Sequence, residues 1–164
     1  MTRVALQPVD LTQVLGAAMA QVEPAARAKR IRMELYVECC DHRVVGDAEQ
    51  LRSVAGNLLS NSIKFTPPRG RVRVRLDRVD EAARLRVDDN GAGIRADFLP
   101  RVFEPFARDA DSENAGAGLG LTIARDVVQT HGGSIEASSP GPNLGSTFTV
   151  ELPALIVPPE MYWG

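Results

Sequence analysis

The chain is poor in the residues that mark several large classes of protein. It has only two cysteines among 164 residues, and these are the neighbours Cys39 and Cys40. Adjacent cysteines are badly placed for a structural disulfide, and two cysteines alone do not make a zinc site. No apolar run approaches the roughly 20 residues of a membrane-spanning helix, and residues 1–20 contain no signal-peptide pattern. We therefore expect a reducing, cytoplasmic location, while a membrane anchor elsewhere in a full-length protein stays open.

Aromatic residues are also scarce, and the net charge is small. Aromatic residues make up 5% of the chain and its net charge is −2. Neither an aromatic platform for single-stranded nucleic acid nor a general attraction to nucleic acid or an acidic membrane is expected. The hydrophobic content of 44% and charged content of 24% are ordinary for a globular protein. This length allows one domain with a sizeable core, which we expect at residues 1–152, followed by an apolar, proline-rich tail at 153–164.

The stretch from Gly46 to Pro67 is predicted to form a helix around which the other segments are organised. Asp47 can cap the free amides at its start, and the residue before Pro67 is pushed out of helical geometry. One face is apolar, with Leu51, Val54, Leu58 and Phe65. A neighbouring face carries Asn57, Asn61 and Lys64 at the spacing i, i+4, i+7. Amide oxygens can ligate a hard cation and a lysine can meet phosphate, although a solvated polar face explains the same pattern.

Periodicity predicts the remaining elements. A short first strand at residues 4–6 would be closed by Gln7 and Pro8, and a helix over about residues 11–30 would kink or break at Pro24. Alternation of apolar and polar residues predicts strands at 31–37, 71–76, 84–89, 134–138 and 146–152. A short helix is expected within 95–103 and a longer one over about 121–131.

The alternation in the two central strands indicates a sheet with one packed face and one wet face. The strand at 71–76 places Val72, Val74 and Leu76 opposite three arginines, and a hairpin joins it to the strand at 84–89. Helices should therefore cover only one side of the sheet. The arginines are interpreted as the solvated outer face, and a basic binding patch is the alternative.

Asp89 breaks the alternation because its parity places it on the inward face with Leu85 and Val87. A carboxylate that faces a core is costly unless something hydrogen-bonds to it. Asp89 also opens a turn with glycines at 91 and 93, where the backbone can bend sharply and approach a ligand. The residue is either an Asx cap of this turn or a fixed acceptor for the amino group of a flat heterocycle.

A long polar segment precedes the last predicted helix. Residues 109–114 are small and polar without periodicity, so we expect a mobile lid, with residues 107–117 exchanging amide hydrogens more slowly once nucleotide binds. Glycines at 116, 118 and 120 then open the helix. Glycine amides at a helix N-terminus can cradle phosphate, although one glycine-rich loop alone is weak evidence.

The motifs in this order resemble those of the catalytic, ATP-binding domain of sensor histidine kinases. They are Asn57…Asn61-x-x-Lys64-Phe65, Asp89-x-Gly91-x-Gly93, Phe103-x-x-Phe106, Gly116-x-Gly118-x-Gly120 and Gly145-x-Thr147, similar to the N, G1, F and G2 boxes and a terminal GT motif. The resemblance covers about residues 3–152. It implies a Bergerat-type fold, an α+β two-layer sandwich whose mixed sheet is covered on one face by about three helices, with a flexible ATP lid.

The resemblance also implies roles for single residues. Asn57 would hold Mg²⁺, while Asn61 and Lys64 would support the phosphates; Asn57 and Lys64 are thereby the candidate catalytic residues. Asp89 would accept a hydrogen bond from the adenine amino group. Thr147 would contact Asp89 through a water molecule. The remaining candidates for contact with ATP are Phe65, Gly91, Gly93, Phe106, Arg108, Gly116, Gly118, Leu119 and Gly120.

Two departures from the family pattern limit what the resemblance implies. Many members carry an acid or glutamine four residues before the first asparagine of the N box, where this chain has Ser53. The phosphoacceptor segment is also missing, because His42 and His131 look like ordinary surface or capping residues. The chain therefore resembles an excised domain.

Three functions remain open from the sequence. The leading hypothesis is a protein-histidine kinase domain that presents the γ-phosphoryl group of Mg-ATP to its own N-terminal dimerisation and phosphotransfer domain. A response regulator would be an indirect partner, which receives the phosphoryl group from that domain. The second is an ATP- or ADP-sensing module without productive transfer, which Ser53 motivates. The third, an ATP-hydrolysing relative of the topoisomerase or chaperone type, needs a water-activating acid that Ser53 does not provide.

Overall fold

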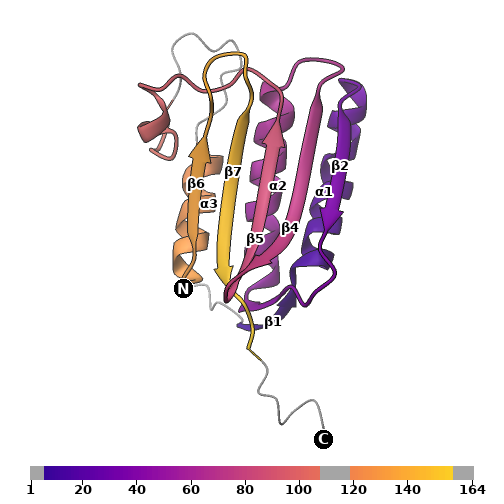
Figure 1. Ribbon diagram of the computed structural model, residues 1–164, viewed down its shortest axis with the longest axis vertical. Coiled ribbons are helices and arrows are strands. Elements are labelled where there is room, and N and C mark those ends of the chain that lie inside the picture. The colour runs from indigo at the N-terminus through magenta and orange to yellow at the C-terminus, as the bar shows by residue number, and fades with distance from the viewer. Residues whose placement is uncertain (1–5, 108–118, 157–164) are drawn as a thin grey trace, which may run out of the picture.

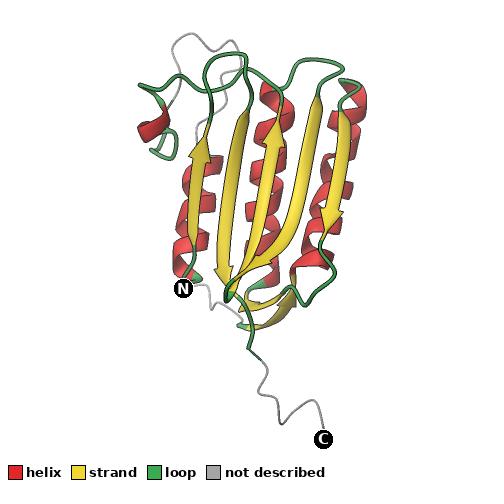
Figure 2. Ribbon diagram, in the orientation of Figure 1, coloured by secondary structure: helices red, strands yellow, loops and turns green. Residues whose placement is uncertain are grey.

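The computed structural model describes residues 6–107 and 119–156, which form an α+β sandwich of two layers (Figures 1 and 2). The helical layer holds α1 (Leu11–Ala28), α2 (Ala48–Phe65) and α3 (Gly120–Thr130). All three helices lie on one face of a five-stranded sheet, with α2 in the middle (Figure 2). The predicted one-sided architecture is confirmed.

The main sheet is mixed. Its strand order is β2–β4–β5–β7–β6, and only β2 and β4 run parallel. The strands are β2 (Arg32–Val37), β4 (Arg71–Val79), β5 (Ala82–Asp89), β6 (Ser134–Ser138) and β7 (Ser146–Pro153). A second, antiparallel pair joins β1 (Gln7–Asp10) to β3 (Arg43–Gly46) at the base of the sandwich (Figure 1).

The core lies between the two layers and follows the predicted alternation. Val72 and Val74 of β4 have no exposed surface, and Leu58 of α2 packs in the same cluster. On the outer face, Arg73 pairs with Glu34 at 3.1 Å, and Arg84 pairs with Asp77 at 2.8 Å. These arginines therefore have acidic partners on the sheet itself, as expected for a solvated outer face.

Helix α2 is capped at both ends by groups from the chain. The Asp47 carboxylate accepts from the amides of Glu49 and Gln50 at 3.0 and 3.1 Å. At the other end, Lys29 Nζ donates to the carbonyl of Ile63 at 2.7 Å, where a cation also complements the helix dipole. The predicted bounds of this helix are confirmed.

The first part of the chain differs from expectation at three places. Helix α1 continues through Pro24 without a break, because Pro24 and Ala20 are both exposed and water can satisfy the carbonyl that loses its helical partner. Strand β1 begins at Gln7 and includes Pro8, which pair with Gly46 and Val45 of β3, although both residues were expected to close the first strand. Of the strand predicted at residues 4–6, residues 4 and 5 lie outside the described residues. The strand β3 itself was not predicted.

Other differences concern short segments. The helix expected within 95–103 is a single 3₁₀ turn, η1 (Leu99–Arg101). His42 is buried, so its interpretation as a surface residue is wrong. Strand β7 runs through Pro153, and Ala154 forms a bridge to Val44, so the chain past residue 152 still pairs with the fold. In the part of the chain that the structure describes, no helix combines the length and apolarity needed to span a membrane.

Candidate functional site

The candidate site lies where the second half of α2 meets the start of α3 and the end of β5. The Asn57 side chain connects the two helices: its Nδ2 donates to the carbonyl of Gly120, the first residue of α3, at 3.1 Å. This bond leaves the Oδ1 atom of Asn57 as the acceptor end of the amide. An oxygen ligand is what Mg²⁺ prefers, so the orientation of Asn57 fits a metal-ligating role.

The predicted polar face of α2 is present beside its apolar face. Asn57, Asn61 and Lys64 are all half-buried, whereas Leu58 and Ile63 between them are buried. The ammonium of Lys64 lies 5.5 Å from the centre of the Phe65 ring, within range of a cation–π interaction. The helix thus brings two amides, one cation and one aromatic ring to the same side of α2.

Asp89 points into the sandwich, as its parity predicted. Its Oδ1 accepts from the Gly91 amide at 2.9 Å and its Oδ2 accepts from the Ser146 hydroxyl at 2.8 Å. Burial raises the pKa of Asp89 above its usual range, and the hydrogen bonds from Gly91 and Ser146 oppose this shift. The Asx bond to Gly91 exists, but each carboxylate oxygen can accept two hydrogen bonds, so the acceptor role also remains available.

The glycines after Asp89 allow the loop to pack closely against its neighbours. A Cβ on Gly91 would lie 2.3 Å from the Phe65 carbonyl oxygen, which accepts the Ala92 amide at 2.9 Å. Gly93 has φ +69°, and a Cβ there would lie 2.1 Å from the carbonyl oxygen of Gly141. Backbone packing on α2 and on the β6–β7 loop therefore already requires glycine at both positions.

Thr147 does not lie beside Asp89, so its predicted role is wrong. In the register of β5 and β7, Thr147 pairs with Asp88, and its hydroxyl donates to the Asp88 carboxylate at 2.6 Å. Ser146 is the residue opposite Asp89 and donates to it. Neighbouring residues of a strand face opposite sides of the sheet. A one-residue error in the register of β7 therefore puts Thr147 in the place of Ser146.

The two phenylalanines of the F-box segment differ. Phe103 packs edge-to-face on Phe148 with ring centres 6.2 Å apart, and its carbonyl accepts from the Thr122 hydroxyl of α3 at 2.8 Å. Phe106 is 67% exposed, so of the two phenylalanines only Phe103 packs against the core. Leu119 is exposed directly before α3. Arg108, Gly116, Gly118 and most of the expected lid (residues 107–117) lie outside the described residues.

Sequence reasoning missed two buried polar residues near the site. Ser62 and Thr66 are completely buried, and neither hydroxyl has a hydrogen-bond partner among the described residues. His131 is the C-cap of α3, which agrees with its interpretation as a capping residue, and it lies at the start of α2, away from the site. Its Nδ1 donates to the Val127 carbonyl at 2.8 Å and its Nε2 accepts the Asp47 amide at 3.1 Å. For Ser62, the available signal was its position on the apolar face between Leu58 and Phe65.

A one-sided α+β sandwich, with an inward carboxylate at a strand end and an amide-bearing central helix, defines a class of nucleotide-binding domains. The comparison with known families agrees: residues 46–156 match the model of the histidine kinase-, DNA gyrase B- and HSP90-like ATPases. The chain belongs to this family.

The individual relatives are sensor kinases. The chain is 39% identical over 157 residues to the signal transduction histidine-protein kinase/phosphatase MprB of Mycolicibacterium smegmatis, covering 93% of the chain and 31% of that protein. It is 32% identical over 184 residues to hybrid signal transduction histidine kinase D of Dictyostelium discoideum, covering 92% of the chain and 12% of that protein. The chain thus spans about a third or less of these relatives.

Solved structures of histidine kinases share the fold. A mycobacterial sensor histidine kinase MprB superposes with a TM-score of 0.81 at 34% identity, covering 93% of this chain and all of that one. Full-length ShkA in complex with AMPPNP gives 0.82 at 28% identity, covering 96% and 33%. The catalytic domain of ThkA gives 0.80 at 25% identity, covering 90% and 97%. The architecture is therefore that of histidine-kinase catalytic domains.

Proposed function

We propose that this chain binds Mg-ATP and presents the γ-phosphoryl group to a histidine on a separate dimerisation and phosphotransfer domain. The observation that carries the proposal is the inward, hydrogen-bonded Asp89 at the end of the polar face of α2. Asp89 would accept a hydrogen bond from the adenine amino group. The half-buried Asn61, Lys64 and Phe65 would border the nucleotide. ShkA, which shares the fold, was solved with the ATP analogue AMPPNP.

Asn57 is the proposed Mg²⁺ ligand. Its Nδ2 donates to the Gly120 carbonyl, so the amide oxygen is the atom that would ligate the metal at the α2–α3 junction. When bound, Mg²⁺ would neutralise charge on the phosphates that develops during transfer. Leu119 and Gly120 border this junction, and Lys64 would add a positive charge on the same face of α2.

Neither histidine of the described chain suits the role of phosphoacceptor. His42 is 3% exposed, with Nε2 at 2.7 Å from the Glu38 carbonyl. His131 uses both ring nitrogens in contacts with the backbone of α2 and α3. These contacts favour an acceptor histidine on another domain. The relatives are about three times as long as this chain or longer, which is enough for a further domain. The response regulator would then take the phosphoryl group from that domain; ThkA, for its part, was solved with the response regulator TrrA.

A nucleotide-sensing module without transfer is the second candidate. Ser53 lies exposed one turn before Asn57, at the position where an acid would assist proton removal. A serine hydroxyl cannot act as that base at neutral pH. This candidate predicts that the chain binds nucleotide but that no phosphohistidine is formed.

Labelled ATP separates the two candidates. The chain is mixed with Mg-ATP carrying a labelled γ-phosphate, with and without a separate dimerisation and phosphotransfer domain of a histidine kinase. Acid-labile label on that domain supports the kinase. ATP binding without any transfer supports the sensing module, and absence of ATP binding contradicts both. The matched variant Asn57→Ala should lose the Mg²⁺-dependent signal.

A further inference from the structure

Strand β2 stands at one edge of the main sheet. It pairs with β4 on one side, and no described strand pairs with its other side. The amides of Arg32 and Glu38, at the two ends of β2, donate to carbonyls on the β4 side at 2.9 Å each. Because alternate residues of a strand bond to the same neighbour, Met33, Leu35 and Val37 direct their N–H and C=O groups to the other edge. Such a row of backbone groups is a template for another strand.

The second half of β2 also exposes apolar side chains. Leu35 is 41% exposed, Tyr36 is 52% exposed and Val37 is 39% exposed. Strand β6, at the opposite edge of the sheet (Figure 1), contains no large apolar side chain of comparable exposure within its residues 134–138. Edge strands of stable monomers are usually protected by charged residues, proline or a bulge. The run from Leu35 to Val37 contains neither charge nor proline, which indicates an edge that a partner covers.

The sequence of β2 is complementary to itself in one antiparallel register. When two copies of a strand pair about a two-fold axis, the residue on the axis lies opposite its own copy. An axis at Glu34 or at Leu35 overlaps nearly the whole strand. The axis at Glu34 would place two carboxylates opposite each other, which is unfavourable. The axis at Leu35 instead places Arg32 opposite Glu38 of the second copy, and the symmetry repeats this opposite-charge pair at the other end.

The register about Leu35 also satisfies the backbone. In an antiparallel ladder, opposite residues that face the shared edge exchange both of their N–H···O=C bonds. Leu35 would do so with Leu35 of the second copy, and Met33 would do so with Val37. The same pairs bring apolar side chains together on the inner face of the sheet. On the outer face the Arg32 side chain is 78% exposed and can reach across to the exposed Glu38.

We propose that the free edge of β2 is an interface between two copies of this chain, in which antiparallel β2 strands join the two five-stranded sheets into one continuous sheet. Leu35 lies at its centre, and the two Arg32–Glu38 pairs lie at its ends. Because β2 is at the opposite edge of the sheet from β6 and α3 (Figure 1), the inference is independent of the proposed ATP site.

Sedimentation equilibrium over a range of concentrations tests the association. The mean mass of the wild type should rise from that of one chain to that of two. Leu35→Lys places two ammonium groups at the axis and removes two apolar side chains, so it should weaken the association at least about tenfold. Leu144→Lys, at a leucine outside β2 that is 65% exposed, is the matched control and should associate like the wild type.

A charge exchange tests the register and leaves the apolar centre intact. Arg32→Glu and Glu38→Arg each place like charges opposite each other at both ends of the pair. Each variant alone should therefore associate about five- to fiftyfold more weakly than the wild type. An equimolar mixture of the two restores both opposite-charge pairs and should recover the wild-type association, which a folding defect in either variant would not allow.

Three results would overturn the inference. The first is the mass of a single chain at every concentration up to about 1 mM, which would exclude a second copy as the partner of this edge. The second is wild-type association in Leu35→Lys, which would place the contact on another surface. The third is a mixture of Arg32→Glu and Glu38→Arg that associates no more strongly than either variant alone, which would reject the pairing about Leu35.

Discussion

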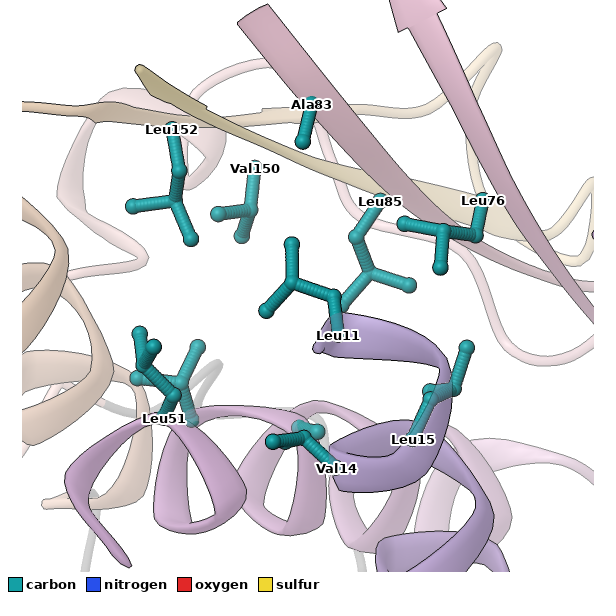
Figure 3. Close-up of a pocket in the computed structure, with 11 residues that line it drawn as sticks. Leu11, Val14, Leu15, Leu51, Leu76, Ala83, Leu85, Val150 and Leu152 are labelled. Carbon is teal, nitrogen blue, oxygen red and sulfur yellow. The ribbon is translucent and has the colours of Figure 1, made fainter. Parts of the chain in front are cut away.

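At the start of α2 the space between helices and sheet is lined by aliphatic side chains alone, whereas at its end the same space holds a carboxylate and hydroxyls. The first region surrounds a cavity of about 20 Å³ (Figure 3). Its lining residues are Leu11, Val14, Leu15, Leu51, Val54, Ala55, Leu76, Ala83, Leu85, Val150 and Leu152. Although one water would fit, no polar side chain lines the cavity, so it is expected to be dry.

The second region, built from the same helix and the same strands, contains Ser62, Thr66, Asp89 and Ser146. Here polar groups are buried, and two hydroxyls have no hydrogen-bond partner within residues 6–107 and 119–156. The first region stabilises the fold through apolar burial, and the second accepts a cost in stability that a ligand can offset. Together with the proposed function, this difference predicts that stability and binding are separated along the length of α2, which substitutions at either end can test.

The largest effect is expected at the aliphatic end. Leu51→Ala enlarges an existing cavity around a side chain that is 2% exposed, and should lower the free energy of unfolding by about 2–5 kcal/mol. Urea denaturation measures this loss. Leu144→Ala, at a leucine that is 65% exposed, is the control and should change stability by less than about 0.5 kcal/mol. Equal effects of the two substitutions would contradict the assignment of this end to stability.

At the polar end, Asn57→Ala should affect binding more than folding. Removal of the amide oxygen should reduce the Mg²⁺-dependent part of ATP affinity at least about tenfold, which is about 1.4 kcal/mol. The measurement compares ATP affinity in Mg²⁺ with that in a chelator, for the variant and the wild type. If the variant keeps the full enhancement by Mg²⁺, Asn57 is not the ligand.

The titration of Asp89 gives a smaller, pH-dependent effect. Because burial raises its pKa, the carboxyl becomes protonated at a higher pH than an ordinary aspartate, and ATP affinity should fall as the pH drops through this raised pKa. Stability follows the opposite sign: the neutral form is favoured in the folded state, so stability is lost as pH rises through the raised pKa. ATP itself also gains protons at low pH. Because Asp89→Asn lacks the titrating carboxyl, the ratio of wild-type to variant affinity at each pH cancels this effect. A constant affinity ratio of wild type to variant across the acid range would contradict this prediction.

The smallest effect is expected on the outer surface, away from both regions. Gly16 lies within α1, is exposed, and has no heavy atom within 4 Å of a Cβ placed on it. Gly16→Ala should therefore raise the free energy of unfolding by about 0.5–1 kcal/mol through helix propensity and leave ATP binding unchanged. Denaturant unfolding tests the stability, and a destabilised variant would show that the glycine is required.

Much of this division was predictable because it follows from local patterns. The caps of α2 at Asp47 and Thr66, the alternation in β4 and the inward Asp89 are each set by a few neighbouring residues. Contacts between distant segments were not predictable. The exchange of Thr147 for Ser146 depends on the register between β5 and β7, and the burial of Ser62 depends on how α2 rests on the end of β5.

The most direct test of the account is calorimetric titration of ATP into wild type, Asp89→Asn and Asp88→Asn. The two aspartates are neighbours on β5, but Asp89 faces the sandwich and Asp88 bonds to Thr147 on the outer face. Asp89→Asn should weaken binding about ten- to a hundredfold, the value of a hydrogen bond to a charged group, without loss of stability at neutral pH. Asp88→Asn should bind ATP like the wild type. Unchanged affinity in Asp89→Asn, or equal losses in both variants, would contradict the assignment of the polar end of α2 to nucleotide recognition.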